Sequence, residues 1–322
     1  MNYLLIANPV SGPKKDTDAL LSKVTEKITT AGHQCTLRTT EYEGHGFEIA
    51  QKAIGMGYDA IIAIGGDGTV NEIARALIDT DQPLGILPNG SGNGLARELR
   101  MPMDPMHAVD TLLRHEVIDI DTCEANGVPF FVTCGIGFDG KISKEFASSK
   151  SRGLATYARE TISQYFDYEP REYHLMIDDK EVTCKAFLIA IANASQYGNN
   201  AFIAPGASMT DGILDVTILR AFPTLDVGKI VFQLFSKELE KNEYVAQYRG
   251  KRIVIKALKP VNYHIDGEPK DKTEELVIEV RPSSLKVLHG RSEDREKTVF
   301  DFFRSVTNSF NGFTDDMLKL LN

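Results

Sequence analysis

The chain has 322 residues, of which 42% are hydrophobic, and its formal net charge is −9 at pH 7. The length predicts about two domains, each with a core of its own. The negative charge excludes a protein that holds nucleic acid mainly through backbone phosphates, because like charges repel. It also disfavours attraction of the whole molecule to an acidic membrane.

Cellular location is predicted from the cysteines and from the lack of a leader. None of the four cysteines forms a C-x-x-C pair or shows metal-ligand spacing, so we expect a reducing, cytoplasmic environment. Met1 leads directly into an apolar segment without the basic start of a signal peptide. The longest uninterrupted apolar run, 186–192, is far shorter than the ~20 residues that cross a bilayer. We therefore expect a cytoplasmic protein that meets lipid only peripherally and transiently, at the inner face of the membrane.

Residues 1–121 alternate predicted strands and helices. In chain order these are a strand at 3–7, a helix at 16–32, a strand at 35–39, a helix at 47–56, a strand at 60–64, a helix at 73–78, a strand at 84–87, and helices at 95–99 and 106–115. Repeated strand–helix units predict a Rossmann-like parallel sheet covered by helices. Ligands of such sheets bind at the carboxyl ends of the strands.

Three polar turns that contain glycine follow predicted strands, at residues 8–12, 65–69 and 89–93. Because parallel strands end at the same edge of a sheet, we expect these turns to converge on one site. A glycine turn at a helix N-terminus offers free N–H groups and a positive dipole end, which suit a phosphate. Asp67 would repel that phosphate unless a divalent metal lies between them or Asp67 orients an attacking hydroxyl. The alternative is a plain tight turn with an aspartate near a helix start.

The pattern changes after residue 121. Short β-rich segments follow at 128–133, 173–177, 186–191, 213–219, 253–257 and 276–280, interrupted by predicted helices at 154–166 and 224–239. This alternation predicts a mostly antiparallel β-sandwich. The tail from about residue 294 is predicted to be a helix with a phenylalanine-rich apolar stripe, which suits packing on the body or on a second subunit better than dipping into a membrane.

The order of the motifs resembles the diacylglycerol kinase catalytic-domain family, which includes bacterial lipid kinases and the sphingosine kinases. The residues that carry the resemblance are Asn8-Pro9-x-Ser11-Gly12, Gly-Gly-Asp-Gly-Thr at 65–69 with Asn71-Glu72, Gly-Ser-Gly-Asn at 90–93, Gly-Phe-Asp at 137–139, Pro205 with Asp-Gly-Ile-Leu-Asp at 211–215, and Asp-Gly-Glu at 266–268. The resemblance implies an α/β nucleotide-binding domain at 1–121, rejoined by 284–322. It also implies a β-sandwich lipid-substrate domain at 122–283, with the active site between the two.

ATP and Mg²⁺ are the cofactors that the resemblance implies. The residues it places around ATP are Asn8, Pro9, Val10, Ser11, Gly12, Thr40, Gly65, Gly66, Asp67, Gly68, Thr69, Asn71, Glu72 and Ser91. Ser91 supplies a hydroxyl where many bacterial relatives have threonine. Gly94 stands where the diacylglycerol kinase branch has aspartate, and Gly-Ser-Gly-Asn-Gly-Leu-Ala is closer to the sphingosine kinase version. The acceptor therefore stays open between lipids such as diacylglycerol and a sphingoid base.

Phosphoryl transfer to an alcohol needs positioned phosphates, charge neutralisation and a carboxylate that takes the hydroxyl proton. The resemblance implies that Glu268 is this general base and that Asp67 is a second catalytic residue. Without the resemblance, residues 266–268 are typical of an Asp-Gly hairpin turn. Asp139 is implied to bind the acceptor hydroxyl; its alternative role is to cap the helix that follows.

A structural Mg²⁺ is implied at Asp211, with the backbone carbonyls of Ser208 and Ile213 as further ligands. The alternative there is a simple Asp-Gly turn. Two other nucleotide motifs do not apply. The P-loop pattern G-x-x-x-x-G-K-[ST] is absent, and the G-x-G-x-x-G match at 135–140 lies in the β-rich half without a βαβ unit.

The predicted function is an ATP- and Mg²⁺-dependent lipid kinase that phosphorylates a hydroxyl of a lipid substrate at a membrane surface. An NAD kinase is the first alternative, because that family shares Gly-Gly-Asp-Gly. Its Asn-Glu pair falls well downstream, however, whereas Asn71-Glu72 follows here almost immediately. A catalytically inactive lipid- or nucleotide-binding relative is the second alternative. No nucleic-acid partner is expected, and the sequence leaves a homodimer open.

Overall fold

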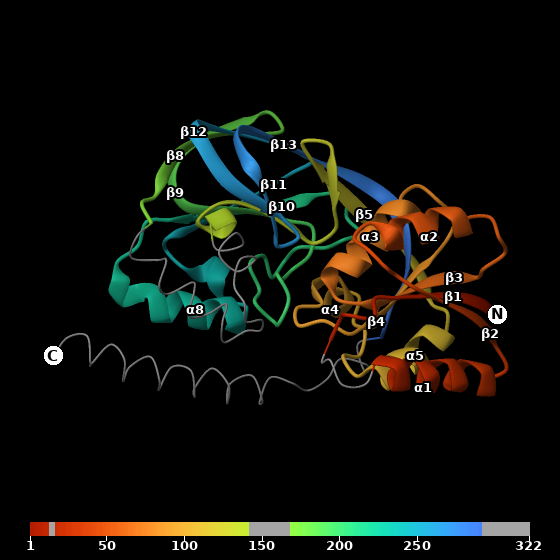
Figure 1. The fold of residues 1–322 in the computed structure, drawn as a ribbon. Coiled ribbons are helices and arrows are strands. Elements are labelled where there is room, and N and C mark those ends of the chain that lie inside the picture. Colours follow the sequence, from red (N-terminus) through yellow and green to blue (C-terminus); the bar gives the residue numbers. More distant parts are fainter. Residues whose placement is uncertain (13–16, 142–167, 292–322) are drawn as a thin grey trace.

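The computed structural model describes residues 1–12, 17–141 and 168–291, which form an α/β half and a β-rich half (Figure 1). The helices predicted at 154–166 and beyond 294 lie outside the described residues, and so does the predicted helix start at Asp16. Within the described chain, no helix has the length and apolar content needed to cross a bilayer.

The α/β half has four parallel strands in the order β2-β1-β3-β4. Its elements are β1 (Asn2–Ala7), α1 (Thr17–Thr30), β2 (Gln34–Thr39), α2 (His45–Ala53), β3 (Ala60–Gly65), α3 (Asp67–Leu77), β4 (Leu84–Pro88), α4 (Gly94–Glu98) and α5 (Pro105–Leu113). Helices α1 and α5 cover one face and α2 and α3 the other (Figure 1). All six residues of β3 are buried, because helices cover the sheet on both sides.

The β-rich half is built from antiparallel strands. They are β5 (Val117–Ala125), β6 (Val128–Phe130), β7 (Thr133–Gly137), β8 (Arg171–Ile177), β9 (Lys180–Ala192), β10 (Leu214–Arg220), β11 (Val245–Gly250), β12 (Arg252–Ile265) and β13 (Glu268–Leu288). The long strands β9 and β12 each pair with β8 along one part and with β7 along the other. This arrangement wraps the strands around an apolar core.

The helix predicted at 224–239 is shorter in the structure. In place of one helix at 224–239, the chain forms a 3₁₀ turn (Thr224–Asp226), α8 (Val227–Ser236) and a second 3₁₀ turn (Leu239–Lys241). Lys237 ends α8 in the left-handed conformation, with φ of 64°. The chain direction therefore changes there, which divides the predicted helix.

Strand β13 joins the two halves and corrects the expectation of a separate, wholly parallel first sheet. It pairs antiparallel with β12 and β5, and at Val287 it pairs in parallel with Leu84 of β4. The described strands therefore form one mixed sheet of 13 strands. Residue 121, where the sequence predicted a domain boundary, lies inside β5. The division into domains itself stays a prediction.

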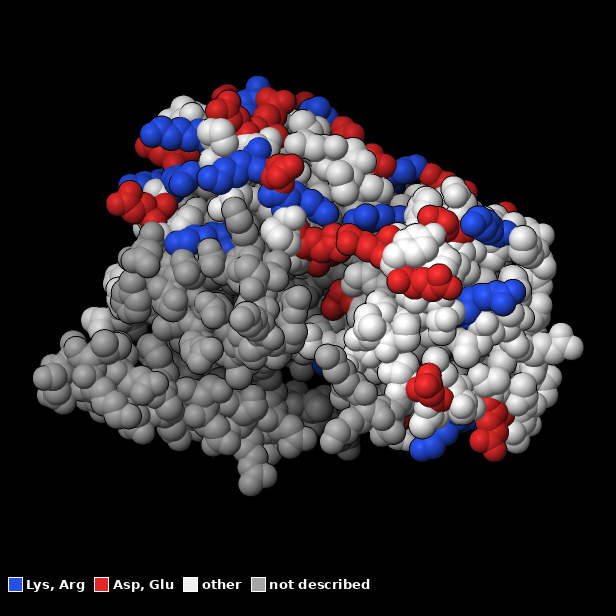
Figure 2. Space-filling view, viewed as in Figure 1, with Lys and Arg blue, Asp and Glu red and all other residues white. Residues whose placement is uncertain are grey.

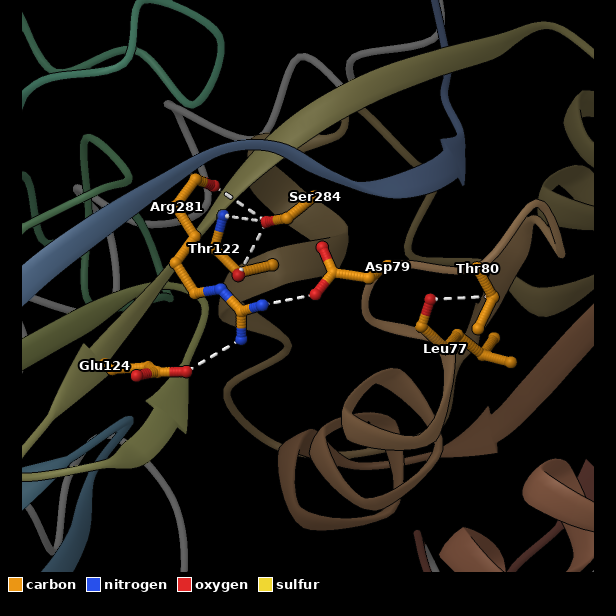
Figure 3. Close-up of polar contacts among 7 residues, drawn as sticks. All are labelled: Leu77, Asp79, Thr80, Thr122, Glu124, Arg281 and Ser284. Atoms are coloured by element: carbon orange, nitrogen blue, oxygen red, sulfur yellow. Dashed lines mark hydrogen bonds and ion pairs between the residues drawn. The ribbon is translucent and has the colours of Figure 1, made fainter.

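Polar contacts fix the chain where β13 passes between the halves (Figure 3). Arg281 on β13 forms ion pairs with Asp79, just beyond α3, and with Glu124 on β5. Nearby, the Ser284 hydroxyl lies 2.7 Å from that of Thr122, also on β5. The pairing of β13 with β5 shifts register between residues 281 and 285. These contacts hold α3, and with it the turn that begins α3, against the β-rich half.

Candidate functional site

The three glycine-bearing turns are hydrogen-bonded to one another at the carboxyl ends of β1, β3 and β4. The Asn8 Nδ2 group donates to Thr69 Oγ1 at 3.1 Å. The Gly66 N–H donates to Ser11 Oγ at 3.4 Å, and Asn89 Nδ2 donates to the Ser11 carbonyl at 3.1 Å. The convergence predicted from the order of strands and turns is therefore present.

Glycine is required in these turns because a Cβ would meet the backbone or a side chain of the neighbouring turn. A Cβ on Gly90 would lie 2.5 Å from the Cα of Gly66, and one on Gly12 would lie 2.5 Å from the Asn89 amide oxygen. Gly12 also has a φ of +84°, which L-residues rarely adopt. The first N–H groups of α3 have no carbonyl partner within the helix. The turns therefore offer backbone N–H donors of the kind that bind phosphates.

Asp67 connects two of the turns. Its Oδ2 accepts the N–H of Asn93 at 2.9 Å, and its Oδ1 accepts the N–H of Gly94 at 2.7 Å. The carboxylate thus caps the start of α4 from the first residue of α3. The sequence did not indicate this structural role. Each oxygen has a second lone pair, so the arrangement is compatible with the predicted catalytic role, which stays a prediction.

The Asn71-Glu72 pair divides its contacts between the two halves. Glu72 accepts the N–H groups of Gly44 at 2.9 Å and Gly46 at 3.1 Å, so its carboxylate holds the start of α2. Asn71 donates from Nδ2 to Asp266 Oδ2 at 3.1 Å. Asn71 is therefore the direct link between α3 and the turn that precedes Glu268. Nucleotide contact by these two residues stays a prediction.

Residues 266–267 form the two-residue hairpin turn that Asp-Gly indicates, with φ of 48° and 79°. The Asp266 carboxylate accepts the N–H groups of Phe131, Val132 and Thr133 at 2.9–3.0 Å. Burial raises the pKa of Asp266, an effect that these three N–H groups oppose. Asp266 is thus a structural residue of the turn, bonded to both halves of the molecule.

Glu268 is the first residue of β13 and pairs across the hairpin with Ile265. Its Oε2 lies 3.0 Å from Lys270 Nζ, and 45% of its side chain is exposed. The hairpin therefore presents a partly exposed carboxylate beside the start of α3. The assignment of Glu268 as the general base stays a prediction.

The other residues assigned to nucleotide and acceptor differ in their exposure. The N–H of Thr40 donates to the Ala7 carbonyl at 2.9 Å, directly before the first turn. Val10 and Ser91 are exposed, which leaves them accessible to a ligand. Asp139 is 5% exposed, follows β7, and accepts the hydroxyl of Tyr197 at 2.6 Å.

Asp211 has contacts that compete with the predicted magnesium site. Its Oδ1 accepts the Ile213 N–H at 3.1 Å, and its Oδ2 forms an ion pair with Arg249. Arg249 also lies 3.4 Å from Asp215. Burial raises the pKa of Asp215, and the guanidinium of Arg249 opposes part of this rise. As arranged, these residues fit an ion pair better than a metal site. The metal role of Ser208, Asp211 and Ile213 stays a prediction.

Catalytic magnesium needs few protein ligands when it is bound through nucleotide phosphates. Among the residues that the structure describes, no three His, Cys, Asp or Glu side chains converge as metal ligands. Magnesium as a cofactor stays a prediction.

On the face of the β-rich half that Figure 2 shows, charges are interleaved rather than segregated by sign. Over the β-rich half, Lys and Arg alternate with Asp and Glu in this view. Two such pairs are Arg252 with Glu279 at 2.7 Å and Lys256 with Glu275 at 3.0 Å. A face of this kind creates no strong field of one sign toward a phosphate polymer.

Comparison with known proteins identifies the family. Residues 2–125 match the model of the diacylglycerol kinase catalytic domain, and residues 132–289 match the YegS C-terminal NAD kinase beta sandwich-like domain. The protein named "Probable lipid kinase YegS-like" of Pseudomonas fluorescens is 30% identical over 261 residues, which are 80% of this chain and 86% of that protein. The protein named diacylglycerol kinase of Bacillus subtilis is 26% identical, over 82% and 88% of the two chains.

The chain belongs to the family of diacylglycerol kinases and YegS-like lipid kinases. Solved structures agree on the fold. A diacylglycerol kinase from Bacillus anthracis superposes with a TM-score of 0.70 at 20% identity, covering 90% of this chain and 97% of that one. An NAD kinase from Archaeoglobus fulgidus, solved with ATP, superposes with a TM-score of 0.53 at 16% identity, covering 95% and 99%. The fold is thus shared with both kinds of kinase.

Three features of the site were missed in the sequence. The contacts of Glu72 and Asp67 to distant backbone N–H groups have no local signal. Arg249, beside Asp211, follows it by 38 residues on a strand that was not predicted. His264, which lies against Asp139, is a single histidine in a strand, where a core residue is the ordinary reading.

Proposed function

We propose that this protein transfers the γ-phosphoryl group of ATP to a hydroxyl of a lipid. The observation that carries the proposal is the contact between Asn71 and Asp266. It brings the hairpin that bears Glu268 to the start of α3, where the three glycine-bearing turns meet. A phosphate cradle and a partly exposed carboxylate are the two parts that phosphoryl transfer to an alcohol needs. Membership of a lipid kinase family supports the same reaction.

In this proposal the α/β half is a Rossmann-like nucleotide domain, and its backbone N–H groups bind the ATP phosphates. ATP with Mg²⁺ supplies the phosphoryl group and neutralises its charge. Ser11, Thr69 and Ser91 offer hydroxyls beside the phosphates, while Asp67 keeps the second and third turns in register. Glu268 accepts the proton of the acceptor hydroxyl.

The acceptor is a lipid presented at a membrane surface, such as diacylglycerol or a sphingoid base. The names of the matched relatives support a lipid acceptor. The β-rich half provides the acceptor side, with Asp139 as the contact to the hydroxyl. A cytoplasmic location with transient membrane contact is part of the same proposal, and a homodimer remains compatible with it.

Replacing the proposed base tests the mechanism. Glu268→Gln should lower turnover by about 10²–10⁴-fold, because a positioned general base contributes that much. Its affinity for ATP, measured by isothermal titration calorimetry, should stay within about twofold, since the three turns are untouched. Glu275→Gln is the matched control: Glu275 also lies on β13, and its carboxylate is also 3.0 Å from a lysine. Turnover by Glu268→Gln at the rate of this control would remove Glu268 from the mechanism.

An NAD kinase is the second candidate, because the fold also superposes on one. Radiolabelled ATP would be supplied with NAD in one arm and with mixed micelles of diacylglycerol, monoacylglycerol, phosphatidylglycerol, ceramide or sphingosine in the other. We expect label in a lipid and none in NADP. Label in NADP would reverse the assignment. ATP binding without transfer in either arm would indicate an inactive relative.

A further inference from the structure

Asp139, the proposed acceptor contact, forms a cluster with His264 and Tyr197, and His264 also contacts the turn that precedes Glu268, the proposed base. Asp139 is 5% exposed and His264 is 1% exposed. Asp139 Oδ2 accepts the Tyr197 hydroxyl at 2.6 Å and lies 3.1 Å from His264 Nε2. The three residues come from the segment after β7, the loop after β9 and the end of β12. The carboxylate is thus contacted from two directions by side chains that no predicted role uses.

The other ring nitrogen of His264 identifies its tautomer. Nδ1 accepts the N–H of Gly267 at 3.2 Å, so this nitrogen carries no proton and, in the neutral ring, Nε2 carries it. Nε2 is therefore the donor that faces Asp139. At 3.1 Å the two atoms are close enough for a hydrogen bond, but Nε2 forms none in the structure. Such bonds in ligand-free sites commonly tighten when substrate binds.

The backbone around the pair leaves room for it. Gly135 on β7 lies directly across from His264 on β12. A Cβ at Gly135 would be 2.1 Å from Asp139 Oδ2 and 2.4 Å from His264 Nε2. Any side chain at residue 135 would therefore displace both groups. The chain has glycine at the one strand position where the carboxylate and the imidazole need that space.

His264 also reaches the turn that carries Glu268. The Gly267 N–H bonded to its Nδ1 belongs to the Asp266-Gly267 hairpin, and Glu268 is the next residue. One imidazole therefore contacts Asp139 through Nε2 and the Glu268 turn through Nδ1.

We propose that His264 is a positioning residue, which aims Asp139 at the acceptor hydroxyl through Nε2 and fixes the Glu268 turn through Nδ1. This inference rests on the lipid kinase proposal above. It adds that the group binding the acceptor and the group removing its proton have a common support, so their separation is set by one ring.

Two substitutions separate the two contacts. The amide of His264→Asn occupies the place of Nδ1, so it keeps the acceptor for Gly267 and loses the donor to Asp139. The amide of His264→Gln occupies the place of Nε2, so it keeps the donor and loses the acceptor. With the lipid that wild type phosphorylates, His264→Asn should raise the acceptor KM about tenfold, and His264→Gln should lower kcat about tenfold. The loss of one hydrogen bond to a charged group or to the turn backbone is worth about a factor of ten. The KM for ATP should stay constant in both.

Tyr197→Phe is a milder variant. It removes the Tyr197 hydroxyl that donates to Asp139 and should also raise the acceptor KM. His174→Asn is the control, since His174 is exposed on β8 and its Nδ1 lies 3.0 Å from the Thr183 hydroxyl; this variant should behave as wild type. The division of roles would be overturned if His264→Asn and His264→Gln changed kcat and KM to the same extent, or if neither variant changed either constant.

A measurement without turnover keeps this inference separate from the function. In ¹⁵N-histidine NMR spectra of wild type, the His264 signals are assigned as those that disappear in His264→Asn. Their chemical shifts should show the tautomer with the proton on Nε2. A proton on Nδ1 would overturn the arrangement even in an active kinase. If wild type phosphorylates no lipid but the Nε2 tautomer is found, the function fails and the positioning geometry stands.

Discussion

Asp67→Asn tests whether Asp67 joins two turns or serves only the bound nucleotide. In the structure, two backbone N–H groups approach two different oxygens of this carboxylate, at 2.9 and 2.7 Å. Asparagine keeps one acceptor and places an NH₂ donor against the other N–H. One hydrogen bond to a charged group is lost, worth about 1.5–3 kcal/mol, and a donor faces a donor. We expect a loss of about 2 kcal/mol in the free energy of unfolding.

The matched control is Asp104→Asn at the start of α5. Asp104 also accepts two backbone N–H groups, from Met106 and His107, but both go to a single oxygen, Oδ1. Asparagine retains that oxygen and caps helices as well as aspartate does. Its cost should stay below about 0.5 kcal/mol.

Urea unfolding, followed by circular dichroism without nucleotide, measures both variants. If Asp67 served only the ligand, removing its charge would leave the free protein unchanged or more stable. Equal midpoints for Asp67→Asn and Asp104→Asn would therefore refute the structural role of Asp67.

Two further predictions concern the charged residues around the site. Mg²⁺ without nucleotide should leave the Tm of wild type nearly unchanged but raise the Tm of Arg249→Met, because loss of the guanidinium leaves the carboxylates of Asp211 and Asp215 without their cation. Arg252→Met is the control. A clear rise in the Tm of wild type would restore the predicted metal site. Burial raises the pKa of Asp266, so the folded state binds the proton of this carboxyl group more tightly than the unfolded state does. The resulting stabilisation is present below a pH of about 4 and is lost as pH rises through the folded pKa. As pH rises, the free energy of unfolding should therefore fall less for Asp266→Asn than for wild type. A steeper fall in the variant would contradict a raised pKa at Asp266.

The sequence predicted those parts of the site that depend on local chemistry. Strand, glycine turn and helix follow one another directly at 60–77, and the Asp-Gly hairpin at 266–267 needs only its own two residues. The convergence of the three turns followed from a general property of parallel strands. Such features are short-range or topological, so one sequence is enough to predict them.

Long-range contacts escaped prediction because nothing nearby in the chain signals them. Glu72 is bonded to N–H groups 26 and 28 residues away, and Asn71 reaches a partner 195 residues away. Strand β5, Val-Ile-Asp-Ile-Asp-Thr-Cys-Glu-Ala, was missed because its acidic residues interrupt the apolar pattern. They are tolerated because Asp121 accepts the N–H groups of Gly212 and Ser283. Which carboxylate meets which backbone group is decided by packing.

The path of β13 has a consequence for dissecting the molecule. A fragment that stops at residue 121 would lack the strand beside β4 and would carry only part of β5. Its sheet would end in unpaired N–H and C=O groups, which invite pairing with another chain. A stable nucleotide-binding fragment would therefore need residues 284–289 grafted onto it, and the natural gene order does not provide that connection.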